Sequence, residues 1–224
     1  MELSMKLKMS RGKSILYHSN ELFLENGYDN TTMRQIAEAA GVSLGLTTYH
    51  FKTKRLIAVT VLEHYLRYLK AQILLRLPPG GYQLERSSAM IHLCAGFFMQ
   101  HPCRKFYLEC LTHDIYMESI QKLGNEAMKQ IARENKVEIA PDLLLLFDNY
   151  IPPAVERILF LEKEKGNFSN IKYEDIPGIV FSIAVEHYID KDKIDDALVR
   201  GHDVAFHILR EIPQGIAHTL FLQE

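Results

Sequence analysis

The sequence predicts an all-α protein with an N-terminal helix-turn-helix domain of three helices, a larger C-terminal helical domain, and nine or ten helices in total. Three observations predict this. Apolar residues recur at spacings of three and four along nearly the whole chain. No alternation of β-branched residues is sustained between turn signals. The clearest breaks are clusters of Gly and Pro, such as residues 77–81.

The elements follow from these breaks in order. The first helix is predicted over residues 10–25 and ends at Asn26-Gly27. Two short helices come next, and a fourth covers 53–76. A fifth, over 84–100, is apolar on all sides, which places it at the centre of the body. The remaining helices are predicted after Pro102, over 114–135, from Pro141 with an interruption at Pro152-Pro153, over 177–189 and over 193–212.

Composition bounds the class of protein. Of 224 residues, 47% are apolar and 24% are charged, which excludes a disordered or collagen-like chain. An odd number of cysteines, three, argues against a secreted disulfide framework, so we expect a cytoplasmic protein. Neither an apolar leader nor a stretch of 18 apolar residues is present, so we expect neither export nor a membrane span.

The net charge of −2 is unevenly distributed. Residues 1–57 hold eight Lys and Arg against five Asp and Glu, a balance of +3, which leaves −5 for the rest. A basic N-terminal quarter on an acidic body is typical of an anion-binding head, although such a split also arises by chance.

Residues 31–54 carry the pattern that indicates a function. Thr32 and Gln35 fit a capping box, Gly41 permits a tight turn, and Ser43 caps a second short helix that runs to about His50. Two short helices joined by a glycine turn form a helix-turn-helix, whose second helix enters the DNA major groove. The alternative is a plain helical hairpin without a role in DNA binding.

Around this motif the chain resembles the tetracycline-repressor (TetR) family. The resemblance runs without gaps from Ile15 to Leu56, about a fifth of the chain, through Leu22-Phe23, Gly27-Tyr28, Thr31-Thr32, Ile36-Ala37, Ala40-Gly41-Val42-Ser43, Gly45, His50-Phe51-Lys52 and Lys54. It implies a bacterial, homodimeric transcriptional regulator without a cofactor or catalytic activity. Such a regulator is usually a repressor that releases a palindromic operator when a small molecule binds its C-terminal domain. We therefore expect a DNA-binding domain over 1–56 and an effector-binding and dimerisation domain over 57–224.

The resemblance also implies which residues face DNA. Thr32, Met33 and Lys54 would contact phosphates, Ser43 to Tyr49 would face the groove, and His50 would end the recognition helix. The family usually has Thr-Leu-Tyr where this chain has Leu46-Thr47-Thr48, so the customary tyrosine contact passes to Tyr49. The expected DNA-binding residues are Thr32, Met33, Ser43, Leu44, Gly45, Leu46, Thr48, Tyr49, His50, Lys52 and Lys54.

Residues 44–50 contain no Arg, Lys, Asn, Gln or acid, the side chains that form bidentate contacts with bases. We therefore expect Leu44 or Leu46 to meet thymine methyl groups, and DNA deformability to supply much of the specificity. Four basic residues near the N-terminus either add phosphate contacts or form a solvated tail: Lys6, Lys8, Arg11 and Lys13.

The body is rich in aromatic residues and Met, and such a bundle can enclose an apolar site. Predicted effector-binding residues are Phe97, Phe98, Phe106, Tyr107, Cys110, Met117, Phe147 and Tyr150, all of which could equally be packed core. Five polar residues either orient a ligand or are simply solvated or satisfied within the helix bundle: Glu109, His113, Asp114, Glu118 and Glu186.

Cys103, Cys110 and His113 raise an alternative, a thiol-sensing or metal-sensing regulator. The two cysteines lie two helical turns apart, unlike the closely paired ligands of tetrahedral metal sites, so we predict no metal site. A further alternative is a helical enzyme or small-molecule-binding protein without DNA readout. No nucleophile elbow, phosphate-binding glycine loop or H-E-x-x-H motif supports an enzyme.

The last predicted helix carries a heptad seam of Ile194, Leu198, Gly201, Ala205, Ile208 and Ile212, and a second apolar stripe on another face. Two apolar faces need two partners, so a four-helix interface with a second subunit is expected, unless the seam is used within the monomer. The expected interface residues are Ile179, Val180, Ile183, His187, Leu198, Gly201, Ala205 and Ile208.

Overall fold

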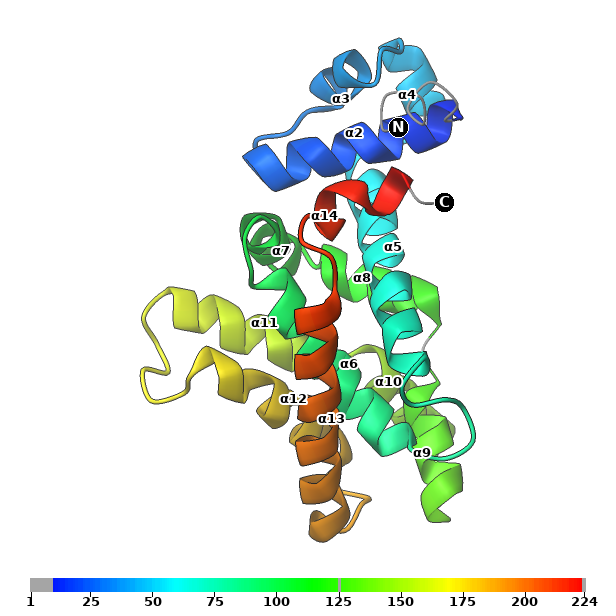
Figure 1. Cartoon of the computed structure of the whole chain (residues 1–224), viewed down its shortest axis with the longest axis vertical. Coiled ribbons are helices and arrows are strands. Elements are labelled where there is room, and N and C mark those ends of the chain that lie inside the picture. Colours follow the sequence, from blue (N-terminus) through cyan, green and yellow to red (C-terminus); the bar gives the residue numbers. More distant parts are fainter. Residues whose placement is uncertain (1–9, 125, 223–224) are drawn as a thin grey trace.

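The computed structural model describes residues 10–124 and 126–222, and the regular elements within them are all helical. A small head lies at one end of the molecule, and a larger body lies below it (Figure 1). One long helix, α5 (Lys54–Leu74), runs from the head into the body. The predicted all-α class is confirmed.

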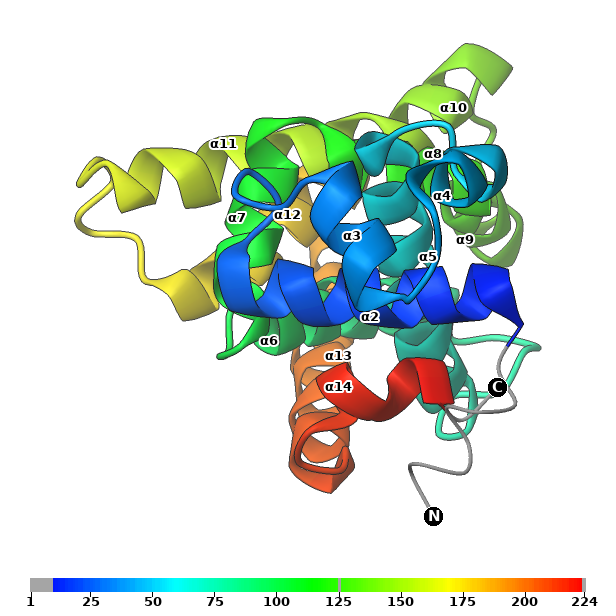
Figure 2. The ribbon, with the colours of Figure 1, turned by 90° about the horizontal axis from the view of Figure 1, so that it is seen from above.

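The head consists of α2 (Arg11–Asn26), α3 (Met33–Ala39) and α4 (Leu44–His50). Seen from above, α2 crosses the molecule and α3 lies over it (Figure 2). Ser10 caps α2, since its hydroxyl accepts a hydrogen bond from the Lys13 amide at 3.4 Å. Gly27, with a φ of 83°, ends the helix as predicted.

The body surrounds α6 (Gln83–Phe98), which contacts α5, α7, α9, α12 and α13. The other body elements are α7 (Cys103–Thr112), α8 (Ile115–Leu123), α9 (Ala127–Asn135), α10 (Pro141–Asn149), α11 (Ile151–Glu164), η1 (Tyr173–Asp175), α12 (Ile176–Val185) and α13 (Lys191–Glu211). Two last turns, α14 (Ile216–Thr219) and η2 (Leu220–Leu222), return to the head beside α2 (Figure 1).

Helix boundaries differ from the prediction at two places and agree with it at a third. The helix expected over 114–135 is two helices, because Gly124 adopts a φ of 63° between α8 and α9. The expected interruption near Pro152-Pro153 is present, and these prolines occupy the start of α11, where a helix tolerates them. The turns α14 and η2 were not predicted, because their apolar residues are too few to show a period.

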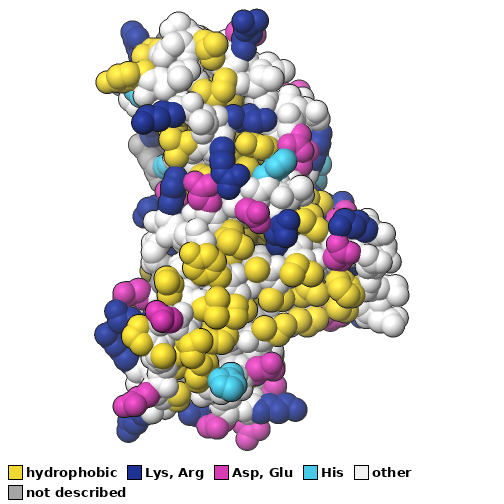
Figure 3. Space-filling view, turned by 180° about the vertical axis from the view of Figure 1, so that it is seen from behind, with side chains coloured by type: hydrophobic (Ala, Val, Ile, Leu, Met, Phe, Trp, Pro, Cys, Tyr) yellow, Lys and Arg dark blue, Asp and Glu magenta, His cyan; other side chains and the backbone are white. Residues whose placement is uncertain are grey.

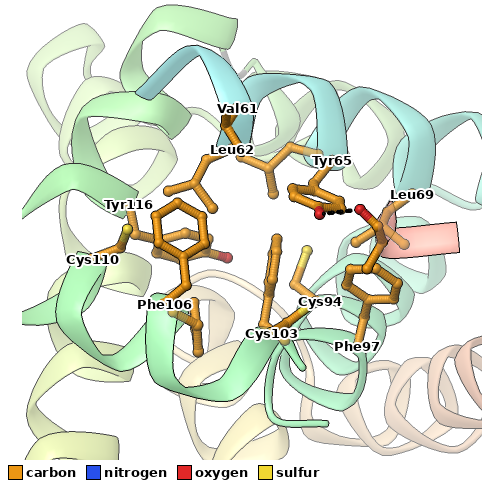
Figure 4. Packing of buried hydrophobic residues seen from close by; sticks show 14 of the residues in the cluster. Val61, Leu62, Tyr65, Leu69, Cys94, Phe97, Cys103, Phe106, Cys110 and Tyr116 are labelled. Carbon is orange, nitrogen blue, oxygen red and sulfur yellow. Dashed lines mark hydrogen bonds between the residues drawn. The ribbon is translucent and has the colours of Figure 1, made fainter. Parts of the chain in front are cut away.

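One hydrophobic core joins head and body. The ring of Phe23 in α2 stacks on that of Phe106 in α7, with centroids 4.9 Å apart. Tyr65 of α5 is fully buried. Its hydroxyl donates a bifurcated hydrogen bond to Asn20 Oδ1 at 2.6 Å and to Ala217 O at 2.9 Å. Figure 4 shows buried side chains of α5, α6 and α7 packed together in the space between these helices. The head is therefore anchored to the body by packed side chains as well as by α5.

The predicted seam of α13 lies against α6 within the same chain. At the closest approach, a Cβ on Gly201 would lie 2.4 Å from Ser88 Oγ and 2.7 Å from the Ala89 backbone nitrogen. The heptad pattern was therefore correct, but its expected use between subunits is wrong for the residues that the monomer already covers. These are Gly201, Ala205 and Ile208 of the seam, together with Val180 of α12.

Candidate nucleic-acid interface

The helix-turn-helix has the geometry that the sequence predicts. Thr32 Oγ1 accepts from the Gln35 amide at 3.2 Å, and Gln35 Oε1 accepts from the Thr32 amide at 2.8 Å, which completes the capping box of α3. Gly41 adopts a φ of 65° in the turn. Ser43 Oγ then accepts from the Leu46 amide at 3.1 Å and begins α4.

Helix α4 presents most of its side chains to solvent. Tyr49 is 82% exposed and Leu44 is 44% exposed, while Thr47 is buried and its hydroxyl donates to the Ser43 carbonyl. Leu46 is half-buried. The other exposed residues of the predicted DNA-binding set are Thr32, Ser43, Gly45, Thr48, His50 and Lys52. Most of the predicted residues are thus exposed on the head, and those within α4 are apolar or hydroxyl-bearing apart from His50.

Two residues predicted to contact phosphates, Lys54 and Met33, make contacts within the protein. Lys54 Nζ donates to the Tyr28 carbonyl at 2.7 Å and lies 4.0 Å from the centroid of the Tyr28 ring. Partial burial lowers the pKa of Lys54. Met33 is half-buried and packs against the core. Of the basic N-terminal residues, Arg11 and Lys13 lie in the first turn of α2, and Lys6 and Lys8 lie outside the described residues.

A polar contact between head and body was not predicted. Glu109 Oε2 of α7 accepts from the Asp29 amide at 3.0 Å, and Lys105 Nζ donates to Asn26 O at 2.7 Å. His113 Nε2 lies 2.7 Å from Asp29 Oδ1. A Cβ on Gly27 would lie 2.5 Å from the Glu109 carboxylate, so this turn approaches α7 closely. In the sequence, only the charged residues of α7 indicated such a contact, and they were equally compatible with exposure to solvent.

Of the other residues considered as ligand-orienting groups, Glu118 contacts the start of α5, while Asp114 and Glu186 do not contact the described part of the head through their side chains. Arg55 Nε of α5 donates to Glu118 Oε2 of α8 at 2.7 Å, and its guanidinium also donates to the His113 carbonyl at 2.7 Å. Asp114 forms an ion pair of 3.2 Å with Arg157, and Glu186 is exposed. The start of α5 is therefore fixed to the turn between α7 and α8.

The eight predicted effector-binding residues line neither of the two hollows of the body, and five of them are buried in the core. Phe98 and Tyr107 stack with centroids 5.0 Å apart in the packed core. Phe97, Phe106 and Cys110 are also buried there, as Figure 4 shows. Met117 and Phe147 are half-buried, and Tyr150 is 44% exposed on α10. The core interpretation, which the sequence left open, fits the five buried residues.

Two hollows lie on the body instead. A broad groove of about 690 Å³ runs between α12 and α13 and includes Ile179, Ile183, Leu198 and Val199. A smaller hollow of about 210 Å³ lies between α6, η1, α12 and α13. His92, Glu174 and His202 line both of them, and none of the eight predicted effector residues lines either.

The cysteines do not form a reactive or metal-binding site. Cys94, Cys103 and Cys110 are unpaired and buried. Burial raises the pKa of all three thiols, that of Cys103 to about 12, so little of any of them is ionised at neutral pH. Over residues 10–124 and 126–222, no group of three His, Cys, Asp or Glu side chains is placed to hold a metal ion. The same stretches contain no helix long and apolar enough to span a membrane.

Comparison with known proteins agrees with this geometry. Residues 15–59 match the family model for bacterial regulatory proteins of the tetR family. The helix-turn-helix transcriptional repressor KstR2 of Mycolicibacterium smegmatis is 30% identical over 92 residues, and the match spans 40% of each chain.

Solved structures extend the likeness to most of the fold. The complex of RolR with resorcinol superimposes with a TM-score of 0.60 at 11% identity, over 87% of this chain and 92% of that one. SmeT, the repressor of the Stenotrophomonas maltophilia efflux pump SmeDEF, gives a TM-score of 0.54 at 14% identity, over 83% of this chain and 93% of that one. At these identities the likeness establishes the fold alone.

Proposed function

We propose that this chain, whose residues 15–59 match the family model for bacterial regulatory proteins of the tetR family, is a dimeric repressor that binds a palindromic operator. In this proposal residues 1–56 bind DNA, and residues 57–224 bind a small, largely apolar or aromatic effector and form the dimer. The observation that carries the proposal is the capped helix α4, with Leu44, Thr48 and Tyr49 exposed on the outer surface of the head.

Readout of the operator rests on apolar contacts and shape. Leu44 is exposed and close to the start of α4, where recognition helices contact bases, so it is the side chain that meets a thymine methyl group. Gly45 leaves room for close approach of the helix to the groove. Thr32 and Lys52 are exposed beside α4 and contact phosphates.

The proposed dimer uses the apolar side of α10 and α11. We define the rear apolar surface as Leu143, Leu145, Leu146, Tyr150 and Ile158, which are 38–56% exposed. Figure 3 shows hydrophobic side chains gathered across the body on this side, where Figure 2 places α10 and α11. Monomers rarely leave such a continuous apolar area in water. Ile179 and Ile183 of α12, Leu198 of α13 and His187 just beyond α12 remain predicted contacts only for the alternative interface at the α12–α13 groove.

Release of DNA follows from linkage between two states of the dimer. The two α4 helices must lie about 34 to 36 Å apart to enter successive major grooves. An effector that binds more tightly to a dimer with another spacing lowers operator affinity by that difference. Arg55, held by Glu118 and by the His113 carbonyl, would transmit movement of α7 and α8 to α5 and the head.

The test is enrichment of fragmented source-genome DNA on the purified protein at physiological salt, followed by sequencing. We expect a short palindrome to be recovered. Tyr49→Ala should abolish the enrichment because Tyr49 projects from α4 with 82% of its surface exposed. Leu75→Ala is the matched control, since Leu75 is 76% exposed but follows α5, far along the chain from the head. Salt-sensitive binding without a preferred sequence would contradict the proposal.

A further inference from the structure

The smaller hollow, which we call the α6–α13 crevice, is lined mainly by aromatic and apolar side chains. Phe160 of α11 is fully buried, and Tyr173 of η1 stacks on it with centroids 6.2 Å apart and an angle of 16° between the rings. Phe206 of α13 and Met99 at the end of α6 add apolar surface. A volume of about 210 Å³ accommodates one or two fused aromatic rings.

The polar groups of the crevice accept hydrogen bonds. His92 Nδ1 lies 2.8 Å from the Ser88 carbonyl, which can only accept, so Nδ1 carries the ring proton. Burial and the neighbouring His202 lower the pKa of His92, so its ring is neutral at pH 7 and Nε2 keeps its lone pair. Glu174 adds a carboxylate, which is paired with Lys172 Nζ at 3.2 Å.

The crevice is connected to the head through α13. Beyond α13 the chain turns at Gly215 into α14, and the Ala217 carbonyl accepts from Asn20 Nδ2 of α2 at 2.7 Å. His218 Nδ1 of the same turn lies 3.1 Å from Glu21 Oε2. A displacement of α13 on α6 would therefore reach α2 as well as the core.

We propose that the α6–α13 crevice is the effector site and that its effector is a planar aromatic compound with a hydroxyl group, which donates a hydrogen bond to His92. This assignment rests on the proposed function and specifies its ligand. The ring lies beside Tyr173 and Phe206, the exposed aromatic side chains of the crevice.

The experiment uses 2-naphthol as the probe, with 2-methoxynaphthalene for comparison, in calorimetric titrations of the full chain. We expect 2-naphthol to bind and its methyl ether to bind about tenfold more weakly, because the ether has no proton to donate. His92→Phe keeps a ring of similar size and should weaken 2-naphthol about tenfold. His207→Phe, on an exposed position of α13 outside the crevice, should leave it unchanged.

Each result has a distinct consequence. Equal binding of 2-naphthol by the His92→Phe and His207→Phe variants would overturn the site, and equal binding of 2-naphthol and its methyl ether would overturn the ligand class. An enriched palindrome together with no binding of 2-naphthol would overturn the crevice while the proposed function stands. Binding that depends on His92, but does not change affinity for an enriched operator, would overturn the role of the crevice as an effector site.

Discussion

Glu156 of α11 lies inside the body with only 3% of its surface exposed. The Tyr107 hydroxyl of α7 donates to Glu156 Oε1 at 2.6 Å, and Tyr116 of α8 also forms a hydrogen bond with this carboxyl. Burial raises the pKa of Glu156 to about 7 even though both hydroxyl groups favour its ionised form. This carboxyl links three helices, and its burial makes stability depend on pH.

The sign of that dependence follows from proton binding. Between pH 4.5, the ordinary value for glutamate, and about pH 7, the folded chain holds a proton that the unfolded chain has released. Stability therefore falls as pH rises through this window, by up to about 3 kcal/mol for this group. Urea unfolding at pH 5 and pH 8 should show a smaller difference in Glu156→Gln than in the unchanged protein.

Other groups titrate in the same range, so the comparison needs a matched variant. Burial also raises the pKa of Asp148, to about 6, and this contribution is common to all the variants. Glu138→Gln changes an exposed glutamate and should keep the pH dependence of the unchanged protein. If Glu156→Gln and Glu138→Gln lost the same free energy of unfolding between pH 5 and pH 8, the assignment to Glu156 would be wrong.

Among the elements, α13 shows how one sequence pattern can serve two purposes. A heptad seam with small residues at its middle allows close packing of two helices, whether the second helix belongs to the same subunit or to another. Here α6 is that helix, and Gly201 lies where the two backbones come closest. The seam therefore stabilises the monomer and leaves the stripe of Val199 and Phe206 exposed.

Gly201→Ala should lower the free energy of unfolding by about 1–3 kcal/mol, because the added Cβ would overlap Ser88 and the backbone at Ala89. Gly178→Ala in α12 is the control. A Cβ there would meet Leu198 Cδ2 at 3.7 Å, an ordinary contact, and alanine favours the helix by up to about 1 kcal/mol. Chemical unfolding measures both. A Gly201→Ala protein as stable as the Gly178→Ala protein would refute the close approach of α13 to α6.

For the molecule as a whole, the rear apolar surface and the exposed stripe of α13 are competing positions for a second subunit. Leu145 is 56% exposed on α10, and Ile158 is 50% exposed on the adjoining α11. Val199 is 64% exposed, but the α12–α13 groove beside it includes four acidic residues, Glu174, Asp175, Glu186 and Asp203. Like charges would face each other across a two-fold axis there, which favours the rear surface.

Leu145→Glu should convert a dimer into a monomer, because it would bury an unpaired carboxylate in the proposed interface. Val199→Glu should leave the dimer intact. Light scattering coupled to size-exclusion chromatography distinguishes the two, and operator affinity should fall only for Leu145→Glu. Dissociation by Val199→Glu alone would place the interface on α13, and an unchanged dimer in both variants would exclude both positions.

The sequence by itself determined the all-α class, the capping box at Thr32, the turn at Gly41 and the cap at Ser43. These features depend on neighbouring residues, and their hydrogen bonds join groups three or four positions apart. The resemblance of residues 15–56 to the TetR family had the same local basis. The single long helix predicted over 114–135 was wrong, because the sequence does not reveal that Gly124 adopts a positive φ.

The tertiary structure decided which apolar faces meet. It packed Phe98, Phe106, Tyr107 and Cys110 in the core, placed the α13 seam against α6, and joined Glu109 to the Asp29 amide across 80 positions. Helical periodicity identifies an apolar face but not its partner, because hydrophobic attraction has no direction. The positions of the exposed surfaces and of the α6–α13 crevice depend on which helices pack together. The sequence does not reveal this, so it could not locate them.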